Sequence, residues 1–559
     1  MDQKRLIIAI VLSILLFIGI QFFMGPEEKA PSDKAPPPPD VVQEQPITDP
    51  ATVPEQRTPL AQAPVVLGDS SGTTKMPTEP VQTQNVTVET NLFSVTLSGK
   101  GATIQELALK QYAQTIDENS PPQLLVSPEK NPNGTVQTSI WANGTFDQPT
   151  IYTTSAPEKV VAIAEKQDIT FVYKMPEGLL VTKTYTFEPN SYIIGLTIQV
   201  NNMTQKTLSD RLSIALQEDF GAKGQSYAFE GPIVKMGKDL IRIKTKKIKD
   251  KDRYTGKIDW IADSGRYFLA SILPPAGEEY DLRLTYSPEK ILTSTLTYPE
   301  KTIQPGQTAT MSSELYFGPK SISILETVGH ELQKVVNFGF FDLLAKPFLW
   351  FMTFLYGFLP NYGLAIILMT IAIKILLWPL SAKSYKSMAE MRKIQPLLTS
   401  LREKHRNDKQ KLNQEMMSLY KTYKINPLGG CLPMILQIPV FFALYRMLYE
   451  AIELRHAPFF GWIQDLSAPD RLFNFPITVP YMEPPYGIPV LTILMGASMF
   501  LQQKMTPIMG DASQQKIMML MPIIFTVIFI NFSAGLVLYW FVNNLVSIGQ
   551  QYYVQKKYS

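Results

Sequence analysis

The sequence predicts a polytopic α-helical membrane protein of six spans, with a large antiparallel β-sandwich outside the membrane and a helical hairpin in the cytoplasm. Three observations predict this class. Long apolar runs gather near the N-terminus and between residues 348 and 553. Short alternating runs broken by turn residues fill residues 84 to 318. Lysine and arginine gather in one loop, 382–427, between two apolar runs. These are the patterns of spans, strands and a cytoplasmic loop, respectively.

The first predicted element is a membrane anchor at residues 1–25. Lys4 and Arg5 precede the apolar run Leu6–Met24, which at about 1.5 Å per residue is long enough to cross a hydrocarbon core of about 30 Å. The run ends in Gln-Phe-Phe-Met rather than in the small residues of a cleavage site, which favours an uncleaved anchor over a signal peptide. The two basic residues place the N-terminus in the cytoplasm.

Residues 26–80 are rich in proline and poor in aromatic residues. Such a segment buries too little apolar surface to fold, so we expect a flexible tether. Residues 81–336 are expected to form the sandwich and to end in a helix, because stretches such as "LLVTKTYTFEPNSYIIGLTIQVNN" alternate with period 2. There is no histidine between Glu89 and Lys320. This argues against a carbohydrate-acting sandwich that uses a histidine acid or base.

Residues 337–360 are predicted to form an amphipathic helix that lies in the membrane interface. Its apolar run, 348–359, is short for a span, and Trp350 and Tyr356 suit an interfacial position. Residues 361–553 should supply five further spans. The run 517–549 is too long for one crossing, and "NFSAG" divides it into two. The predicted spans are 362–380, 428–448, 486–501 and the two parts of 517–549.

The charge of the loops predicts the orientation. Loop 382–427 has 11 Lys and Arg against four acids, whereas loop 451–486 has two Arg and no Lys. The positive-inside rule therefore places 382–427 and the short basic tail 554–559 in the cytoplasm, and the sandwich outside.

Loop 382–427 is predicted to form a helical hairpin, because apolar residues recur every three or four positions on both sides of "HRND". Asn407 or Asp408 is a suitable N-cap for the second helix. The hairpin is interpreted either as a solvated spacer or as a surface that contacts lipid headgroups, ribosomal RNA or a nascent chain. The basic residues of its outer surface are Arg392, Lys393, Arg402, Lys404 and Arg406.

Lys374 lies inside an apolar run, "ILMTIAIKILLWPLSAKSY", where a charge costs roughly 2.5–3.5 kcal/mol at the centre of a bilayer. Its position near the cytoplasmic end allows the side chain to snorkel to the interface, which is the alternative to a functional role. Thr370 shares its helical face, and Gln437 and Asn544 are polar residues of other spans. Polar residues on several spans, with no acidic residue among them, indicate a hydrated internal cavity.

The composition excludes several classes of protein. A net charge of +3 is too small to suggest nucleic-acid binding, and a single Cys431 with three scattered histidines argues against a metal site. The spans lack the Asp, Glu or His relays of a proton-coupled transporter, and there is no P-loop.

Four stretches carry a resemblance to a known family: "YKINPLGGCLPMILQIPVFFALYRML", "ELRHAPFFGWIQDLSAPD", "QQKIMMLMPIIFTVIF" and "SAGLVLYWFVNNLVSIGQQ". In these stretches the chain resembles the bacterial YidC membrane protein insertases of the long type with a large periplasmic domain. The resemblance implies an insertase of the inner membrane, with no cofactor, metal, nucleotide or covalent chemistry. It also implies a periplasmic, sugar-isomerase-like sandwich without catalysis.

The resemblance further implies a hydrophilic groove, open to the cytoplasm and to lipid, that contains one basic residue. The matching positions are Lys374, Thr370, Gln437, Tyr539, Trp540 and Asn544. We expect Phe441 and Phe442 to guide the hydrophobic segment of a substrate into lipid. The chain departs from the family at one point, because arginine is usual where Lys374 stands, and lysine cannot grip a carboxylate with two parallel hydrogen bonds.

The implied partners are nascent membrane proteins, the Sec translocon, the translating ribosome and membrane lipids. Two other functions remain open from the sequence. A solute channel or transporter would give a continuous aqueous path, and a non-catalytic scaffold for membrane complexes would contact folded partners but not emerging chains.

Overall fold

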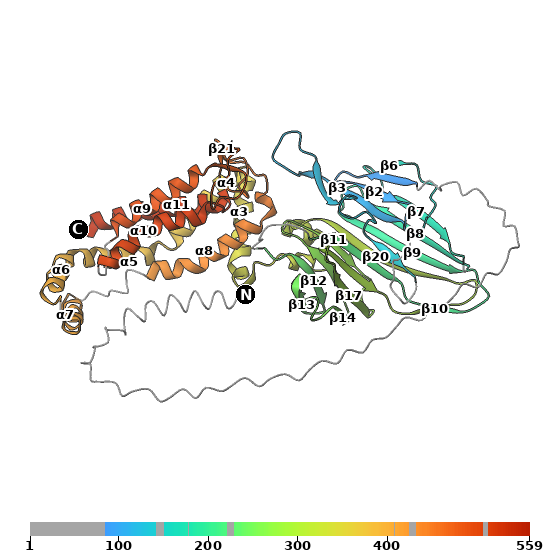
Figure 1. Ribbon diagram of the computed structural model, residues 1–559, viewed down its shortest axis with the longest axis horizontal. Coiled ribbons are helices and arrows are strands. Elements are labelled where there is room, and N and C mark those ends of the chain that lie inside the picture. Colours follow the sequence, from blue (N-terminus) through green and yellow to red (C-terminus); the bar gives the residue numbers. More distant parts are fainter. Residues whose placement is uncertain are drawn as a thin grey trace, which may run out of the picture. The chain divides into compact units, whose positions relative to one another are not determined.

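The computed structural model describes residues 84–140, 150–176, 178–220, 228–406, 408–423, 432–506 and 512–558. Strands dominate the chain up to residue 319 and helices dominate it from residue 322 onwards (Figure 1). The β-rich domain followed by a helical region confirms that part of the predicted fold class. The predicted anchor at 1–25 and tether at 26–80 lie outside the described residues.

The largest sheet of the described residues has eight strands. Its order is β13 (Asp239–Arg242), β12 (Gly231–Met236), β15 (Trp260–Ser264), β16 (Phe268–Leu273), β20 (Thr308–Pro319), β9 (Ile193–Asn202), β8 (Leu179–Phe187) and β7 (Gln167–Lys174). Strand β8 shows why these residues form strands, since every second side chain is buried along its whole length. That alternation is the pattern of a strand with one face on a core.

Two five-stranded sheets pack on the large one. The first has the order β4 (Pro122–Val126), β3 (Thr103–Ala113), β2 (Phe93–Ser98), β1 (Asn85–Glu89) and β6 (Lys159–Val161). The second has the order β14 (Arg253–Gly256), β17 (Tyr280–Tyr286), β18 (Ile291–Thr297), β11 (Ser213–Asp219) and β5 (Gln137–Ser139). Phe93 contacts Phe187 across the first interface, and Ser294 donates a hydrogen bond to Asp263 across the second.

These contacts establish a sandwich. The strand pairs in the described residues of the sandwich are antiparallel except β1 with β6. A short two-stranded sheet of β10 (Leu208–Asp210) and β19 (Lys301–Ile303) accompanies the main sheets. The inner faces bury Trp260, Tyr185 and Phe93 completely. One 3-10 turn, η1 (Thr245–Lys247), connects β13 to β14.

The chain leaves the sandwich through α2 (Ile322–Val328) and the 3-10 turns η2 (Leu332–Val335) and η3 (Gly339–Phe341), and then enters α3 (Asp342–Phe358). One face of α3 buries Leu349 and Met352. The other face exposes Leu343, Trp350 and Phe358. Helix α3 thus has apolar side chains on its exposed face as well as on its buried face.

The apolar run predicted to be one helix from 362 to 380 is two helices. α4 (Tyr362–Leu376) starts at Asn361, whose side chain accepts a hydrogen bond from the Leu364 N–H. α5 (Trp378–Lys393) follows at an angle of 67°. Pro379 explains the break, because its ring would clash with the backbone carbonyl of the preceding helical turn and because it has no backbone N–H to donate. The predicted end at residue 380 is therefore wrong.

The remaining helices are α8 (Leu432–Glu450), α9 (Val490–Met505), α10 (Ala512–Phe529) and α11 (Ala534–Tyr558), with the 3-10 turn η5 (Ile452–Leu454) after α8. The run 517–549 is divided between two helices, α10 and α11, at the predicted break. The predicted start of a helix at residue 486 is wrong, because Tyr486–Ile488 is strand β22, which pairs with β21 (Leu472–Phe475). In the predicted short tail 554–559, α11 continues as far as Tyr558.

Among the described residues, no single helix has both the length and the apolarity of a membrane span; the bent pair α4–α5 meets both criteria only when its two helices are taken together.

Residues 396–423 belong to a different compact unit from the sandwich and the other described helices. It contains most of α6 (Gln395–Lys404) and all of α7 (Lys409–Thr422). The Asp408 side chain accepts a hydrogen bond from the Lys411 N–H and so caps α7, as one of the two predicted caps. The other, Asn407, lies outside the described residues. His405 lies between the two helices, with its Nε2 3.1 Å from a carboxylate oxygen of Glu415.

Candidate functional site

Lys374 lies in the last turn of α4 and is almost completely buried, with 2% of its surface exposed. Its ammonium donates a hydrogen bond of 2.7 Å to the Ser547 hydroxyl of α11. Ser547 in turn donates to the Asn543 carbonyl one helical turn earlier. The charge therefore rests against a hydroxyl oxygen inside the helical region, and the side chain does not extend to an exposed surface as a snorkelling lysine would.

Helix α11 carries the polar stripe that faces this lysine. Asn544, Ser547 and Gln551 follow one another at spacings of three and four residues, which places them on one helical face. The Asn544 amide donates to the Ser498 hydroxyl of α9 at 3.0 Å. The stripe thus connects α11 to α4 and to α9 through polar contacts.

The ends of the same helices add further buried polar groups. The Gln550 amide lies 3.5 Å from the Lys374 carbonyl, and the Gln551 amide donates to the Met505 carbonyl of α9 at 2.9 Å. Within the described part of the chain, the side-chain carbonyls of Gln550 and Gln551 are buried without a hydrogen-bond partner. Buried acceptors of this kind mark a place where water or a polar ligand is favoured.

The other predicted groove residues lie in different surroundings. Thr370 is buried and donates to the Ile366 carbonyl of its own helix, at 2.6 Å, rather than to Lys374. Gln437 is half-buried on α8, which packs against α11, and Tyr539 is buried on α11. The structure therefore joins Lys374 and Asn544 to one polar cluster on α11, and gives Thr370 a separate hydrogen bond.

Trp540 belongs to an aromatic cluster beside the polar stripe. Its ring centroid lies 4.6 Å from that of Phe441 and 4.8 Å from that of Phe529. Phe442, on the neighbouring face of α8, stacks on Phe341 with a centroid distance of 5.8 Å. Phe441 is thus a half-buried member of an aromatic surface formed by α8, α10 and α11, and the half-buried Phe442 extends it to η3.

Four further polar residues of this cluster were not predicted from the sequence: Ser498, Ser547, Gln550 and Gln551. The spacing of the α11 stripe carried the signal for two of them, since Ser547 and Gln551 continue the helical face of Asn544. Ser498 was not identifiable in this way, because its partner lies on another helix.

The loop between α8 and α9 explains the motif "ELRHAPFFGWIQDLSAPD" in structural terms. The Asp470 carboxylate accepts hydrogen bonds from the first free N–H groups of α9, and the Leu466 and Ala468 carbonyls accept those of α11. The Arg471 guanidinium donates to the Ile530 carbonyl at the end of α10. These residues fix the positions of three helix ends and therefore serve the site indirectly.

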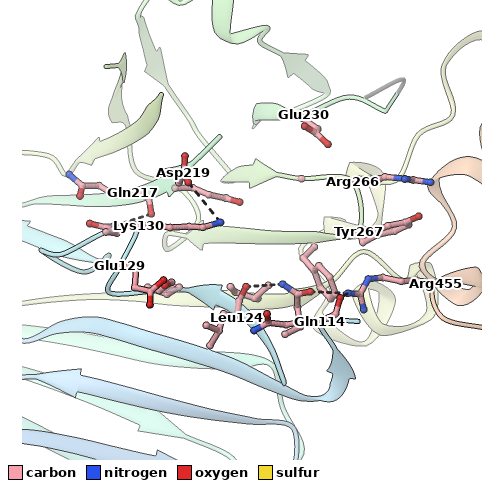
Figure 2. A pocket seen from close by; sticks show the side chains of 18 of the residues that line it. Gln114, Leu124, Glu129, Lys130, Gln217, Asp219, Glu230, Arg266, Tyr267 and Arg455 are labelled. Atoms are coloured by element: carbon pink, nitrogen blue, oxygen red, sulfur yellow. Dashed lines mark hydrogen bonds and ion pairs between the residues drawn. The ribbon is translucent and has the colours of Figure 1, made fainter. Parts of the chain in front are cut away.

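A second polar region lies where the sandwich meets the end of α8 (Figure 2). The Arg266 guanidinium donates two hydrogen bonds, of 2.9 and 2.7 Å, to the Tyr449 carbonyl. Arg455 reaches Gln123 of β4 at 2.9 Å. Both arginines border a cavity of about 730 Å³.

One histidine lies against the sandwich, although none occurs in the sequence between Glu89 and Lys320. The His330 ring folds back and pairs with Glu314 of β20 at 3.1 Å. The absence of histidine between Glu89 and Lys320 therefore does not leave the sandwich without one, because His330, beyond the last strand, lies against the sheet.

On the predicted basic surface, Arg392, Lys393, Lys404 and Arg406 are exposed, and Arg402 is half-buried. Leu398 and His405 are buried. This distribution agrees with one apolar seam and a solvated basic exterior.

Comparison with known proteins identifies the family. Residues 85–351 match the model of the YidC periplasmic domain, and residues 354–559 match that of the 60Kd inner membrane protein. The membrane protein insertase YidC of Syntrophus aciditrophicus is 40% identical over 100% of both chains. That of Syntrophobacter fumaroxidans is 37% identical over 99% of this chain and 100% of its own.

The chain belongs to the YidC family of membrane protein insertases. The resemblance drawn from the sequence is thereby confirmed. As a member of this family, the protein is an inner membrane protein with a periplasmic domain, and it belongs to a non-catalytic family.

Two solved structures are similar at a low level. A crystal structure of an active YidC insertase is 16% identical, with a TM-score of 0.37, over 85% of this chain and 95% of its own. A galactose mutarotase related enzyme from Lactobacillus acidophilus is 11% identical, with a TM-score of 0.32, over 42% of this chain and 97% of its own. The sugar-isomerase-like character of the sandwich stays a prediction.

Proposed function

We propose that the protein inserts newly made membrane proteins into the inner membrane and that the polar cluster around Lys374 lowers the cost of bringing their polar flanks into the bilayer. The observation that carries the proposal is the buried ammonium of Lys374 against Ser547, with no acidic residue in the predicted spans. An ammonium held by a neutral hydroxyl keeps its net positive charge available to an incoming carboxylate.

The mechanism uses the two neighbouring surfaces in turn. A carboxylate on the substrate flank would displace Ser547 and bind Lys374, while Asn544, Gln437 and Thr370 would supply further polar contacts. The aromatic surface with Phe441, Phe442 and Trp540 lies beside this path. The hydrophobic segment of the substrate would slide along these rings into lipid, since the rings give apolar contacts and require no hydrogen-bond partner from the segment.

The proposal includes six spans with both termini in the cytoplasm, the orientation favoured by the basic loop 382–427. It also places α3 in the interface on the periplasmic side. The exposed face of α3 supports this placement, because Trp350, Phe354 and Phe358 are 65%, 47% and 71% exposed and would be costly in water.

The proposed partners are nascent membrane proteins, the ribosome that makes them and the Sec translocon. The exposed basic residues of the hairpin would face the ribosome or acidic lipid headgroups, where the loss of each lysine or arginine weakens a phosphate contact.

Variants of Lys374 test the role of the charge in reconstituted vesicles. For a single-span substrate with an acidic translocated flank, Lys374→Met should lower the insertion rate by about tenfold, the loss expected for one hydrogen bond to a charged group. Lys374→Arg should preserve insertion, and Lys374→Glu should impair it most. Lys504→Met, which removes an exposed lysine of α9, is the control. Wild-type insertion of the acidic substrate by Lys374→Met would show that the charge is not needed.

Photocrosslinking distinguishes the insertase from the channel and the scaffold. A photoreactive residue at Gln437 should crosslink to a stalled nascent membrane protein, and one at the exposed sandwich position Lys249 should not. Solute uptake by vesicles without any crosslink would favour a channel, and crosslinks to folded partners alone would favour a scaffold.

A further inference from the structure

A small pocket of about 430 Å³ lies between α5 and α11, apart from the polar cluster. Trp378 and Tyr553 contact one another in it, with ring centroids 6.1 Å apart. Two ammonium groups lie over the Tyr558 ring, that of Lys386 at 5.2 Å and that of Lys557 at 5.9 Å. The pocket thus has an aromatic floor and a cationic rim. Its lining residues are Trp378, Ala382, Tyr553, Val554, Lys557 and Tyr558.

Along α4 and α5, and likewise along α11, the exposed side chains change in the same order from apolar to aromatic to lysine. On α4 and α5, Ile375 and Leu376 are 67% and 78% exposed, Trp378 follows, and the exposed Lys383 and Lys386 come next. This is the order of hydrocarbon, interface and headgroup met by a chain that leaves a bilayer.

On α11, Leu545 is 46% exposed, and Tyr552 and Tyr553 are 61% and 58% exposed. The exposed Lys556 and Lys557 follow. Trp378 contacts Tyr553, and Lys386 contacts Tyr558. These contacts place the aromatic residues of the two segments beside one another, and their lysines beside one another.

The charge around the pocket is one-sided. Four lysines lie on the two helices near it, whereas α11 has no acid and α5 has only Glu390, which lies 3.9 Å from Lys386. A phosphate at the rim would meet several cations, with Glu390 beside Lys386 as the one carboxylate of α5 and none among the lining residues. An exposed apolar edge directly below the rim adds a surface that lipid chains cover and that RNA does not.

We propose that this pocket binds the headgroup of an anionic glycerophospholipid, with Lys386 and Lys557 at its phosphate and Trp378 and Tyr553 against the upper part of its chains. A headgroup bound there bridges α5 and α11 beside the end of α4. The inference relies on the placement of the chain in the inner membrane and not on the proposed insertion mechanism.

Native mass spectrometry of the full-length protein with equal amounts of phosphatidylglycerol and phosphatidylcholine tests the proposal. The wild type should retain more phosphatidylglycerol, and the double variant Lys386→Gln/Lys557→Gln should lose that preference by at least about fivefold, the effect of roughly one lysine at a membrane surface. The double variant Lys246→Gln/Lys249→Gln, at two exposed lysines of the sandwich, removes the same charge elsewhere and should keep the preference.

Three outcomes would overturn the proposal: equal retention of the two lipids by the wild type, an unchanged preference in the pocket variant, or an equal loss in the sandwich variant Lys246→Gln/Lys249→Gln. Weaker ribosome binding by the pocket variant with its lipid preference intact would assign the lysines to RNA and also overturn it. Lys374→Met should keep the lipid preference, so that failure of the proposed insertion mechanism is seen separately.

Discussion

At the scale of single residues, two buried lysines show how differently this chain holds a charge. The Lys183 ammonium in the sandwich core donates to the carbonyls of Ala102, Val136 and Gly101 at 2.6, 3.0 and 3.4 Å. These carbonyls occupy all three of its donors. Lys374 donates to one hydroxyl among the described residues. Lys183 therefore has a structural role, because its hydrogen bonds connect a strand to neighbouring turns. Lys374 retains donors that can bind a polar group of a substrate.

Lys183 makes the stability of the sandwich depend on pH. Burial lowers the pKa of its ammonium from 10.5 to about 7. Between these values the folded state has lost the proton and the unfolded state retains it, so this residue makes the free energy of unfolding rise with pH. The rise is about 1.4 kcal/mol per pH unit. Lys183→Met removes this pH-dependent contribution. The free energy of unfolding of the variant, measured relative to that of the wild type, should therefore fall steadily from pH 7 to pH 10.

Urea midpoints of the sandwich, measured by pulse proteolysis at several pH values, give this difference. Lys249→Met, at an exposed lysine of the same domain, should run parallel to the wild type. A constant difference between Lys183→Met and the wild type would show that Lys183 does not titrate in this range.

At the scale of elements, the ends of helices were harder to predict than the helices themselves. Pro379 breaks the run at α4–α5, and Pro489 precedes α9. The cap of α9 comes from far away in the sequence, since Asp470 accepts its first free N–H groups and also a hydrogen bond from the Trp462 indole. A carboxylate at this position also interacts favourably with the helix dipole.

Asp470→Ala should therefore destabilise the helical region. The expected loss is about 1–2 kcal/mol, the usual cost of removing an N-cap, seen as a lower midpoint of thermal unfolding in detergent. Glu483→Ala, at an exposed carboxylate of the same loop, should have little effect. If both variants unfold with the wild type, Asp470 does not act as the cap.

At the scale of the whole molecule, the sandwich is joined to the end of α8 by polar contacts rather than by an apolar interface alone. The Arg266 guanidinium lies 3.8 Å from the centroid of the Tyr449 ring, in addition to its two hydrogen bonds to the Tyr449 carbonyl. Ser321 donates to Glu453 at 3.1 Å, next to the exit from the last strand. These contacts connect the periplasmic domain to the helix that carries Phe441 and Phe442.

Arg266→Ala should loosen this junction. Amide hydrogen exchange in the segment 449–457 should become about tenfold faster, as expected when one charged hydrogen-bonding group is lost. Arg283→Ala removes an exposed guanidinium that lies 3.8 Å from Asp252 and should leave this segment unchanged. Equal exchange in the wild type and Arg266→Ala would show that the contact does not hold the two regions together.

The sequence by itself determined the strands, the order of domains, the helical hairpin and the identity of Lys374 as an unusual charge. These depend on local periodicity and on composition, which each segment carries alone. Tertiary structure alone decided that Ser547 accepts from Lys374, that Ser498 accepts from Asn544, that Asp470 caps α9 and that His330 reaches the sandwich. Each of these pairs joins residues distant in sequence, and a hydrogen bond between them forms only after packing has fixed the position and direction of both side chains.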